Sequence, residues 1–429
     1  MEKLSLKEII FALVESIDLV NYLLRNHHRR VTYIAYEIGK QMSLDKHQLR
    51  RLVLSAALHD IGALYVKERD ELIRLDIENP HPHAIRGAIL LKEFNYFEEI
   101  SDIILHHHRA YDDGKGLIFN HKEVPIESFI IHIADRVEIL YDSELSYYAQ
   151  VDNIKHQIIK RTHSIFTPEC VSAFVEVSEN ESFWLGLESI RFSNLLHGVF
   201  DSKEDIDIDL EVLEHISSLF ANIVDSRSLY TASHSKAVAE VAYELCQLNG
   251  LDNVSCEKIR IAGLLHDLGK IGIPNEIVEK EGKLTFDEYE QMKSHAYYTY
   301  QILKEFKGLE DICKWASMHH EKRDGLGYPF HISNDDFSIE MDILAISDVF
   351  TAISEDRPYR SGMKVDEIHH FIEEEFRHRI DPDLLKLLIK NMDKLNLIRK
   401  ETQERVYEDY DLNNKKISQM TDQLNGKAI

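Results

Sequence analysis

The sequence predicts an all-α protein built from two tandem copies of one helical domain. Glycine and proline are scarce, with 17 and 8 in 429 residues, which favours long helices with few tight turns. Few segments alternate apolar and polar residues as half-buried strands do. A repeated spacing indicates the duplication, because His27 precedes His59 by 32 positions and His234 precedes His266 by the same 32.

Four segments follow one another along the chain. Residues 1–150 form the first copy, a degenerate version of the domain that opens with an apolar stripe at helical spacing between residues 4 and 24. Residues 151–205 are predicted to be a helical linker. Residues 206–393 form the second copy. Residues 394–429 are polar with loosely spaced apolar positions, which favours a helical tail or short coiled coil over a disordered end.

The offset between the two copies widens along the chain. An Ala-Tyr-Glu triplet and a His-Asp pair repeat at an offset of 207, and His83 matches His295 at 212. A later pair, His106–His107, is matched to His319–His320 at 213, as is the Asp that follows each pair. Duplication followed by a short insertion would leave this pattern.

Two apolar runs at matching places in the copies have strand-like propensity. They are residues 129–133 and 341–346, each just before an Asp. Short apolar runs of this kind suit a buried strand or the start of a buried helix equally well. Because the rest of the chain has helical patterns, we predict helix at both places.

The charge balance of the chain limits which polyanionic partners it can bind. There are 50 Lys+Arg against 75 Asp+Glu, a formal charge of -25, which disfavours binding to polymeric nucleic acid or to an anionic membrane. An anionic substrate would therefore need a locally positive site made of metal ions and a few fixed basic side chains.

The four cysteines predict a reducing compartment. Cys170, Cys246, Cys256 and Cys313 form neither a Cys-X-X-Cys motif nor a metal-spaced cluster. No apolar run approaches the roughly 18 residues that a membrane span needs, and the N-terminus lacks a signal-peptide layout. We therefore expect a soluble, cytoplasmic protein.

The segment 266–274, His-Asp-Leu-Gly-Lys-Ile-Gly-Ile-Pro, is the centre of the candidate site. An imidazole and a carboxylate at the end of a buried helix, with an ammonium three residues on, suggest a metal site that holds an anionic ligand. An isolated pair is more often a helix-end His with a capping Asp, so further ligands are required. Helix-like segments of the second copy supply a full set: His234, His266, Asp267, His295, His319, His320 and Asp348.

This mixed nitrogen and oxygen set suits iron or manganese, with nickel, zinc and magnesium as alternatives. Seven ligands exceed the need of one ion and fit two divalent ions that share a bridging carboxylate and leave positions open for water. The predicted chemistry is hydrolysis of a phosphate ester by a hydroxide that bridges the two metals.

Two motifs carry a resemblance to a known family. Residues 319–329, His-His-Glu-Lys-Arg-Asp-Gly-Leu-Gly-Tyr-Pro, together with His-Asp-Leu-Gly-Lys at 266–270, resemble the HD-GYP family. These are bacterial metal-dependent phosphodiesterases of the HD superfamily that hydrolyse cyclic di-GMP. The likeness covers about residues 225–393. It implies that the seven residues are metal ligands and that Asp267 bridges the ions as a catalytic residue.

The resemblance also implies substrate contacts. Lys270 matches a lysine beside the scissile phosphate and is a catalytic and substrate-binding candidate, while Arg357 and Arg360 match basic residues that hold substrate phosphates. Tyr328 lies in the Gly-Tyr-Pro loop near the site, a loop also implied to contact signalling proteins such as diguanylate cyclases. Tyr230 stands where some members have a glutamate that binds a third metal, so we expect two metals.

The first copy repeats the ligands but not the phosphate-handling groups. Ala63 stands at the place of Lys270, and Tyr-Asp-Asp-Gly at 111–114 replaces the Gly-Tyr-Pro loop. We predict a metal-binding, non-hydrolytic domain, with an empty structural copy or an active site for another substrate as alternatives. The candidate ligands of this second metal site are His27 (with His28 as a rival), His59, Asp60, His83, His106, His107 and Asp135.

We therefore predict a cyclic-dinucleotide phosphodiesterase. Cyclic di-GMP, cleaved to linear pGpG with GMP as an optional further product, is the first choice of substrate. The alternative is 3'3'-cyclic GMP-AMP, because no base-recognising residue can be assigned. A non-hydrolytic sensor or scaffold that uses Tyr328 and the first copy as contact surfaces is a rival from a different class. A broader HD-superfamily nucleotidase is another. A homodimer is compatible with the sequence.

Overall fold

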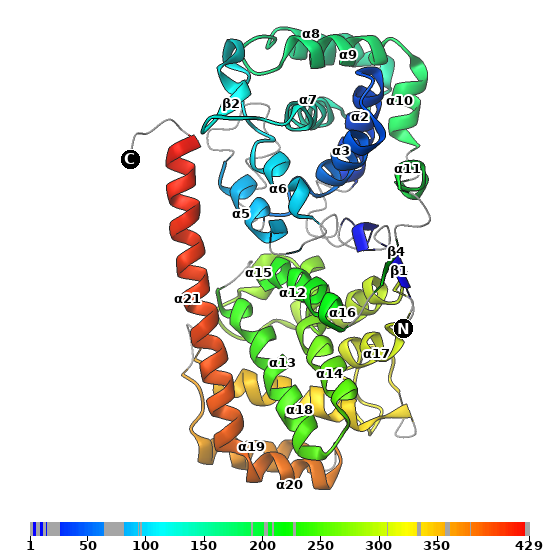
Figure 1. The fold of residues 1–429 in the computed structure, drawn as a ribbon. Helices are drawn as coiled ribbons and strands as arrows, with labels where there is room; N and C mark the ends of the chain where they lie inside the picture. Colours follow the sequence, from blue (N-terminus) through cyan, green and yellow to red (C-terminus); the bar gives the residue numbers. More distant parts are fainter. Residues whose placement is uncertain are drawn as a thin grey trace. The chain divides into compact units, whose positions relative to one another are not determined.

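The computed structural model is all-α, as the sequence predicts (Figure 1). Apart from two ribbons of two strands each, the regular elements of the part that the structure describes are helices. The chain divides into two compact units, Ser5–Ile206 with Lys415–Ile429 and Met1–Leu4 with Asp207–Asn414. The described residues are 3–5, 9–11, 14, 26–63, 81–92, 94, 97–189, 192–200, 205–207, 210–225, 229–306, 308–332, 336–356, 361–377 and 379–424.

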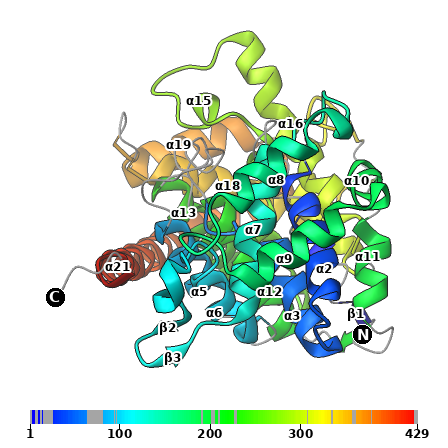
Figure 2. The ribbon, with the colours of Figure 1, turned by 90° about the horizontal axis from the view of Figure 1, so that it is seen from above.

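The first unit is built around α2 (His27–Gln41), which packs against α3 (Lys46–Leu58), α7 (Ile126–Leu140) and α9 (Pro168–Ser178). Figure 2 shows α2 beside α3 and α9. The apolar stripe predicted between residues 4 and 24 lies mostly outside the described residues. The other elements of this unit are α5 (His81–Lys92), α6 (Glu98–Leu105), η2 (Asp112–Leu117), the hairpin of β2 (Ile118–Phe119) and β3 (Lys122–Glu123), η3 (Tyr147–Ala149), α8 (Val151–Ile159), α10 (Glu181–Glu188) and α11 (Phe192–Val199).

The helices between residues 151 and 199, which the sequence analysis assigned to a linker, pack on the first unit. α8 contacts α7, α10 contacts α2, and α11 contacts α3. Their buried faces carry large side chains, among them Phe174 and Trp184. Burial of this much aromatic surface explains why these helices join the core of the first unit.

The second unit repeats the layout of the first. α13 (Leu229–Asn249) packs against α14 (Asn253–Leu265) and α18 (Ile339–Ser354), as α2 does against α3 and α7. The other elements of this unit are α12 (Leu210–Asp225), η4 (Leu268–Gly272), α15 (Asn275–Val278), α16 (Phe286–Leu303), α17 (Glu310–Ser317), α19 (Val365–Phe376), α20 (Pro382–Lys390) and the part of α21 (Met392–Leu424) up to Asn414. A short ribbon pairs β1 (Lys3–Ser5) with β4 (Asp205–Asp207).

Both apolar runs with strand-like propensity are helical. They lie in α7 and α18, each of which buries residues on most sides. A helix that is apolar all round belongs in a core, and this burial explains why the sequence of these helices lacks a polar face. The prediction of helix at residues 129–133 and 341–346 is confirmed.

An aspartate caps the start of α3 in the first unit and of α14 in the second unit. Asp45 accepts a hydrogen bond from the backbone N–H of Gln48 at the start of α3, and Asp252 does the same for Ser255 at the start of α14. Aspartate is a favoured N-cap because its carboxylate satisfies an otherwise unpaired N–H. These caps fix where the helices begin, and both helices end at the His of a His-Asp pair.

A glycine after each His-Asp pair lets another helix approach closely. A Cβ on Gly269 would overlap the carbonyl oxygen of His295 in α16, and a Cβ on Gly62 would overlap that of His83 in α5. Thr299 links the same segments in the second unit, since its Oγ1 accepts from the N–H of Gly269 at 2.9 Å. The glycines therefore bring α5 and α16 against the turn that carries the candidate ligands.

We expect Gly269→Ala to destabilise the second unit by about 1–3 kcal/mol, because the added methyl must push α16 away. The shift would move His295 and weaken metal binding as well. Thermal unfolding and metal content of the full chain measure the two effects. Gly198→Ala in α11 is the matched control for added bulk in open space, since nothing lies within 4 Å of its Cβ position and its backbone is helical. Normal metal content in Gly269→Ala would contradict this account.

Among the described residues, no helix is long and apolar enough to cross a membrane. All four cysteines are buried free thiols. Burial raises the pKa of Cys170 and of Cys313 to about 12, so these thiols stay protonated and unreactive at neutral pH.

Candidate metal centres

The seven predicted ligands of the second copy converge, and we call them the second centre. His234 comes from α13, His266 and Asp267 from the end of α14, and Asp348 from α18. The donor atoms form three overlapping groups, in each of which all atoms lie within 4.8 Å of one another. The groups are His234, His266 and Asp348; His266, Asp267 and His319; and His295, His319 and His320.

Asp267 lies between the outer groups. Its Oδ2 is 3.3 Å from Nε2 of His266, and its Oδ1 is 3.6 Å from Nε2 of His295. On the other side of His266, Oδ1 of Asp348 lies 3.1 Å from Nε2 of His234 and 3.8 Å from Nε2 of His266. Asp267 thus presents one oxygen to the group of His234, His266 and Asp348 and the other oxygen to the group of His295, His319 and His320. A bridging ligand needs this placement.

The orientation of the imidazoles fits a bound cation. Nδ1 of His266, His295 and His319 each donates to the backbone carbonyl three residues earlier, at 2.6 to 2.7 Å. A carbonyl only accepts, so Nδ1 carries the proton and Nε2 faces the centre. Burial lowers the pKa of His295 to about 4 and that of His319 to about 3, so both rings are neutral.

Two observations test whether the centre fits a metal. The Nε2 atoms of the neutral His295 and His319 face each other at 3.5 Å, so two lone pairs oppose each other. Nε2 of His266 is buried and has no partner with good hydrogen-bond geometry among the described residues, its nearest carboxylate oxygen being Oδ2 of Asp267 at 3.3 Å. A divalent cation among these atoms would satisfy all of them, and such fixed tautomers are typical of histidine metal ligands. The residues present therefore fit a metal centre.

Without metal, a proton takes the place of a cation at His234. Burial lowers the pKa of this imidazole, but Glu355 and Asp348 outweigh it and raise the pKa to about 10. The pKa of Asp348 is held well below its usual range, because His234 and His266 outweigh the effect of burial. Metal binding to His234 near neutral pH must therefore release a proton.

Glu355 orients His234 and was not predicted from the sequence. Its Oε2 lies 3.4 Å from Nδ1 of His234 and accepts from Nε2 of Gln403 in α21 at 3.1 Å. Arg399, also in α21, donates to Gln403. The segment that the sequence analysis read as a polar tail therefore supports the centre. A signal was present in the spacing, because Glu355, the residue that directly follows α18, comes seven residues, or two helical turns, after Asp348.

We expect Glu355→Gln to weaken metal binding at the second centre by about 10–100-fold, the usual cost of removing a carboxylate that orients a ligand histidine. Titration of the metal-free full chain with Mn²⁺, read by calorimetry, measures the affinity. Glu340→Gln, in the first turn of α18 and outside the centre, is the control. Equal affinities in Glu355→Gln and wild type would show that the carboxylate has no such role.

The predicted substrate-binding residues are partly in place. Nζ of Lys270 lies 2.5 Å from Oδ2 of Asp267, at the edge of the centre. The ring of Tyr328 lies 4.8 Å from the ring of His320, so the Gly-Tyr-Pro loop reaches the centre. Arg357 and Arg360 lie outside the described residues, and of Tyr230 the structure describes the backbone only.

A buried carboxylate shapes the Gly-Tyr-Pro loop. Glu321 accepts from the backbone N–H groups of Phe330, His331 and Ile332, at 2.6, 3.0 and 3.3 Å. The backbone N–H of Tyr328 donates to the carbonyl of His320. Burial raises the pKa of Tyr328, so its phenol stays protonated and can act as a hydrogen-bond donor.

The first copy also gathers its donors, in what we call the first centre. One group joins His27, His59 and Asp135, and another joins Asp60, His83, His107 and His108. His27, rather than its rival His28, is in the first group. Nδ1 of His27 contacts Glu138 at 2.5 Å, the same contact that Glu355 makes with His234, although Glu138 follows Asp135 by three residues only.

The structure corrects one predicted ligand of the first copy. His106 packs its ring against Phe119 at 5.0 Å and lies outside both groups, and His108 takes its place. The rings of His107 and His108 lie 4.1 Å apart, as His319 and His320 do at 3.9 Å. The pairs therefore match at an offset of 212, the same offset that relates His83 to His295, and the extra residue falls after the pair. Keeping the offset of 212 would have identified His108.

Comparison with known proteins identifies the domain. The model of the HD domain matches residues 12–156 and 218–384, one match to each copy. The chain belongs to the HD domain family. This membership confirms the predicted place in the HD superfamily and the tandem duplication on which the sequence analysis rests.

HD-family relatives differ in how much of the chain they match. The chain is 28% identical over 403 residues to 3'3'-cGAMP-specific phosphodiesterase 1 of Vibrio cholerae, covering 90% of this chain and 92% of that protein. It is 32% identical over 186 residues to a cyclic di-GMP phosphodiesterase of Thermotoga maritima, covering 43% and 50%. The crystal structure of the cyclic GMP-AMP specific phosphodiesterase V-cGAP3 of V. cholerae matches with a TM-score of 0.62 at 24% identity, covering 91% and 98%.

Proposed function

We propose that the second centre is the active site of a metal-dependent phosphodiesterase that hydrolyses a 3'3'-cyclic dinucleotide. The observation that carries the proposal is the convergence of seven nitrogen and oxygen donors, with Lys270 against the central carboxylate. Divalent cations bound to these donors would activate water and take up charge on the phosphoryl oxygens. The donor set favours iron or manganese over magnesium, because imidazole nitrogen outnumbers carboxylate oxygen.

The residues of the chain itself position the substrate. The Lys270 ammonium stands beside Asp267 with its side chain 23% exposed, so it can reach a bound phosphate from the edge of the centre. His320 and Asp348 are the two donors that are not fully buried, and they mark the side from which a substrate enters. Tyr328, whose ring is tilted against that of His320, lies on that same side and offers its phenol to the ligand.

We expect Lys270→Met to lower kcat by about 10²–10³-fold, the usual cost of removing one donor to the charge that develops in a transition state. Metal content should stay normal, because Lys270 is not a donor to the metals. Steady-state hydrolysis and metal analysis of the full chain check both statements. Lys258→Met, which removes an exposed lysine paired with Asp311, is the control. Loss of metal in Lys270→Met would mean that the lysine holds the centre together instead.

The share of this chain that each relative matches ranks the two candidate substrates. The cyclic di-GMP phosphodiesterase of T. maritima matches less than half of the chain, while the 3'3'-cGAMP-specific enzyme of V. cholerae matches nearly all of it. We therefore place 3'3'-cyclic GMP-AMP before cyclic di-GMP, the first choice of the sequence analysis. Turnover of both dinucleotides by the manganese- or iron-loaded chain under reducing conditions decides the order.

Binding without cleavage of either dinucleotide would overturn the proposal and favour a sensor or scaffold. Preference for mononucleotides would favour a broader nucleotidase. A cytoplasmic location and contacts of the Gly-Tyr-Pro loop with signalling proteins belong to the same proposal. In support of the latter, Leu326 in this loop exposes 76% of its surface.

A further inference from the structure

We propose that the first unit holds a firmly bound divalent metal ion in a closed site formed by Asp60, His83, His107 and His108. The site uses none of the donors of the second centre. It serves the first unit as a structural ion and is not open to substrate. This inference does not depend on the proposed function.

The four donor atoms surround one small space. Nε2 of His83 lies 3.2 Å from Oδ1 of Asp60, 3.3 Å from Nε2 of His107 and 3.1 Å from Nε2 of His108. Oδ1 of Asp60 lies 3.6 Å from Nε2 of His107. Four donors from four side chains are the number that structural zinc sites use. The second copy offers Asp267 and three histidines at the matching places, so the first copy has lost no donor here.

The imidazoles are oriented toward a cation. Nδ1 of His107 donates to the carbonyl of Ile104 at 2.6 Å, so its Nε2 presents a lone pair to the other donors. Two imidazole nitrogens and one carboxylate oxygen lie within 3.1 to 3.3 Å of Nε2 of His83, and a single proton on that atom can be shared with only one of them. A divalent cation among them removes the conflict, as it does in histidine metal sites generally.

The first centre is more closed than the second. His108 is 6% exposed, while its counterpart His320 is only half-buried. The side chain of Asp135 is 3% exposed, against 13% for Asp348. Catalytic sites keep an open position, whereas structural sites are enclosed by protein. The difference in exposure therefore separates a structural ion in the first copy from catalytic ions in the second.

Two side chains account for the closure. Arg136 is buried and its Nη2 lies 2.5 Å from Oδ2 of Asp135, on the side where Val349 follows Asp348 in the second copy. The ring of His132 packs edge-on against His108 at 5.5 Å, where the second copy has the small Ala345. Larger groups in the first copy thus fill the space that is open to solvent in the second.

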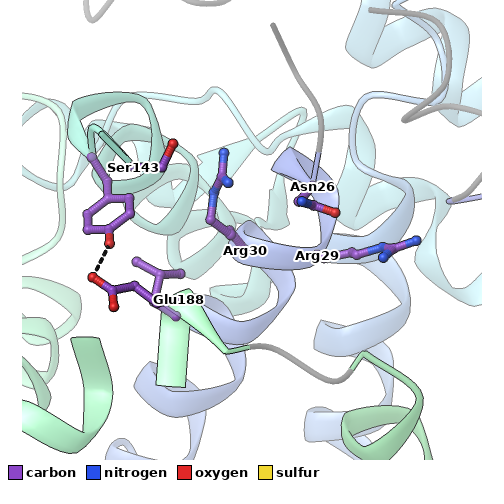
Figure 3. Close-up of a pocket in the computed structure, with 7 residues that line it drawn as sticks. Asn26, Arg29, Arg30, Ser143 and Glu188 are labelled. Carbon is purple, nitrogen blue, oxygen red and sulfur yellow. Dashed lines mark hydrogen bonds between the residues drawn. The ribbon is translucent and has the colours of Figure 1, made fainter. Parts of the chain in front are cut away.

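A cavity of about 410 Å³ at the start of α2 does not reach the site (Figure 3). It is lined by Asn26, Arg29, Arg30, Tyr141, Ser143, Leu187 and Glu188, none of which belongs to either donor group. Arg30 bonds Glu138, and Glu138 in turn bonds His27. The ion pair of Arg30 and Glu138 therefore lies between this cavity and the nearest donor of the first centre, His27. This agrees with a site that is closed to substrate.

Retention of zinc by the full-length chain tests the inference. The protein is loaded with Zn²⁺, passed through excess EDTA on a desalting column, and the zinc that remains per chain is measured by mass spectrometry. We expect wild type to keep at least about one ion, since enclosed structural sites release metal slowly. His83→Ala and His108→Ala should each keep about one ion fewer than wild type.

Matched variants separate the closed site from its surroundings. His106→Ala removes a buried histidine that lies next to the site but is not one of its donors. His295→Ala removes the counterpart of His83 in the second copy. Both variants should retain as much zinc as wild type after EDTA. Circular dichroism checks that each variant folds. If His83→Ala does not fold, the comparison of zinc retention between His106→Ala and His108→Ala tests the inference. The inference is overturned if wild type retains no zinc, if His108→Ala retains the wild-type amount, or if His106→Ala loses the ion.

Discussion

Under the proposed function, Asp267→Asn is expected to lower hydrolysis of the cyclic dinucleotide by at least about 10³-fold, because Asp267 would help to hold the cations, whose stabilisation of charge in the transition state would contribute several kcal/mol. Asp267 is the one carboxylate that faces both His266 and His295 with separate oxygens, and it also holds Lys270. An amide keeps the shape of the side chain but removes the charge. The loss therefore reports on electrostatics, because the volume is unchanged.

The effect of Asp267→Asn is measured as the change in kcat with saturating Mn²⁺. Metal content and thermal unfolding are measured on the same protein. Asp311→Asn is the matched control, since it removes an exposed carboxylate of the same unit that pairs with Lys258. We expect the control to keep wild-type turnover. Turnover within tenfold of wild type in Asp267→Asn would show that the chemistry takes place without a bridging carboxylate.

Removal of metal is expected to lower the Tm of the second unit by roughly 10 °C, because an ion present at a thousand times its Kd stabilises the folded state by about 4 kcal/mol. The physical reason lies in the composition of the centre. The buried carboxylate of Asp267 and the mostly buried carboxylate of Asp348 lie among histidines whose lone pairs oppose one another. Without cations, these buried polar groups are only partly satisfied by one another, and this lowers the free energy of unfolding.

Differential scanning calorimetry of the full chain with EDTA and with Mn²⁺ measures this shift. The double variant Asp267→Asn, Asp348→Asn gives the comparison, because it lacks the two carboxylates that we propose as metal ligands and should respond much less to EDTA. An unchanged Tm after EDTA, with metal analysis showing that the ions of the second centre have left, would contradict the account.

The sequence predicted most of the second centre because its ligands have a chemical signature. His266 and Asp267 are adjacent at the end of a buried helix, and the other donors are polar residues in apolar segments. Such residues are costly to bury without a partner, so their spacing carries information that survives without coordinates. The two-copy architecture was predictable for the same reason, since the spacing from His27 to His59 recurs in the second copy.

The supporting residues were harder to predict because they have no fixed spacing. Glu138 follows its aspartate by three residues and Glu355 by seven, although both reach Nδ1 of the first histidine. Gln403 supports Glu355 from a helix whose sequence is polar and has no pattern that marks a core. Contacts of this kind depend on where helices pack, and packing is decided by the whole fold.

The helices between residues 151 and 199 illustrate the same limit. Their apolar positions predicted helix correctly, but periodicity shows only that a face is buried and not which surface covers it. The structure places these helices on α2, α3 and α7 of the first unit. His106 and His108 show a different limit, since a single inserted residue between two matching segments can be placed on either side of the pair.

An anomalous-difference map at the absorption edge of the bound metal, from crystals of catalytically active protein, tests the central claim most directly. We predict two peaks in the second unit, one beside His234 and Asp348 and the other beside His295 and His320, with Asp267 between them. Crystals of active protein that show no peak among these side chains, or a peak that leaves His234 and Asp348 without an ion, would contradict it.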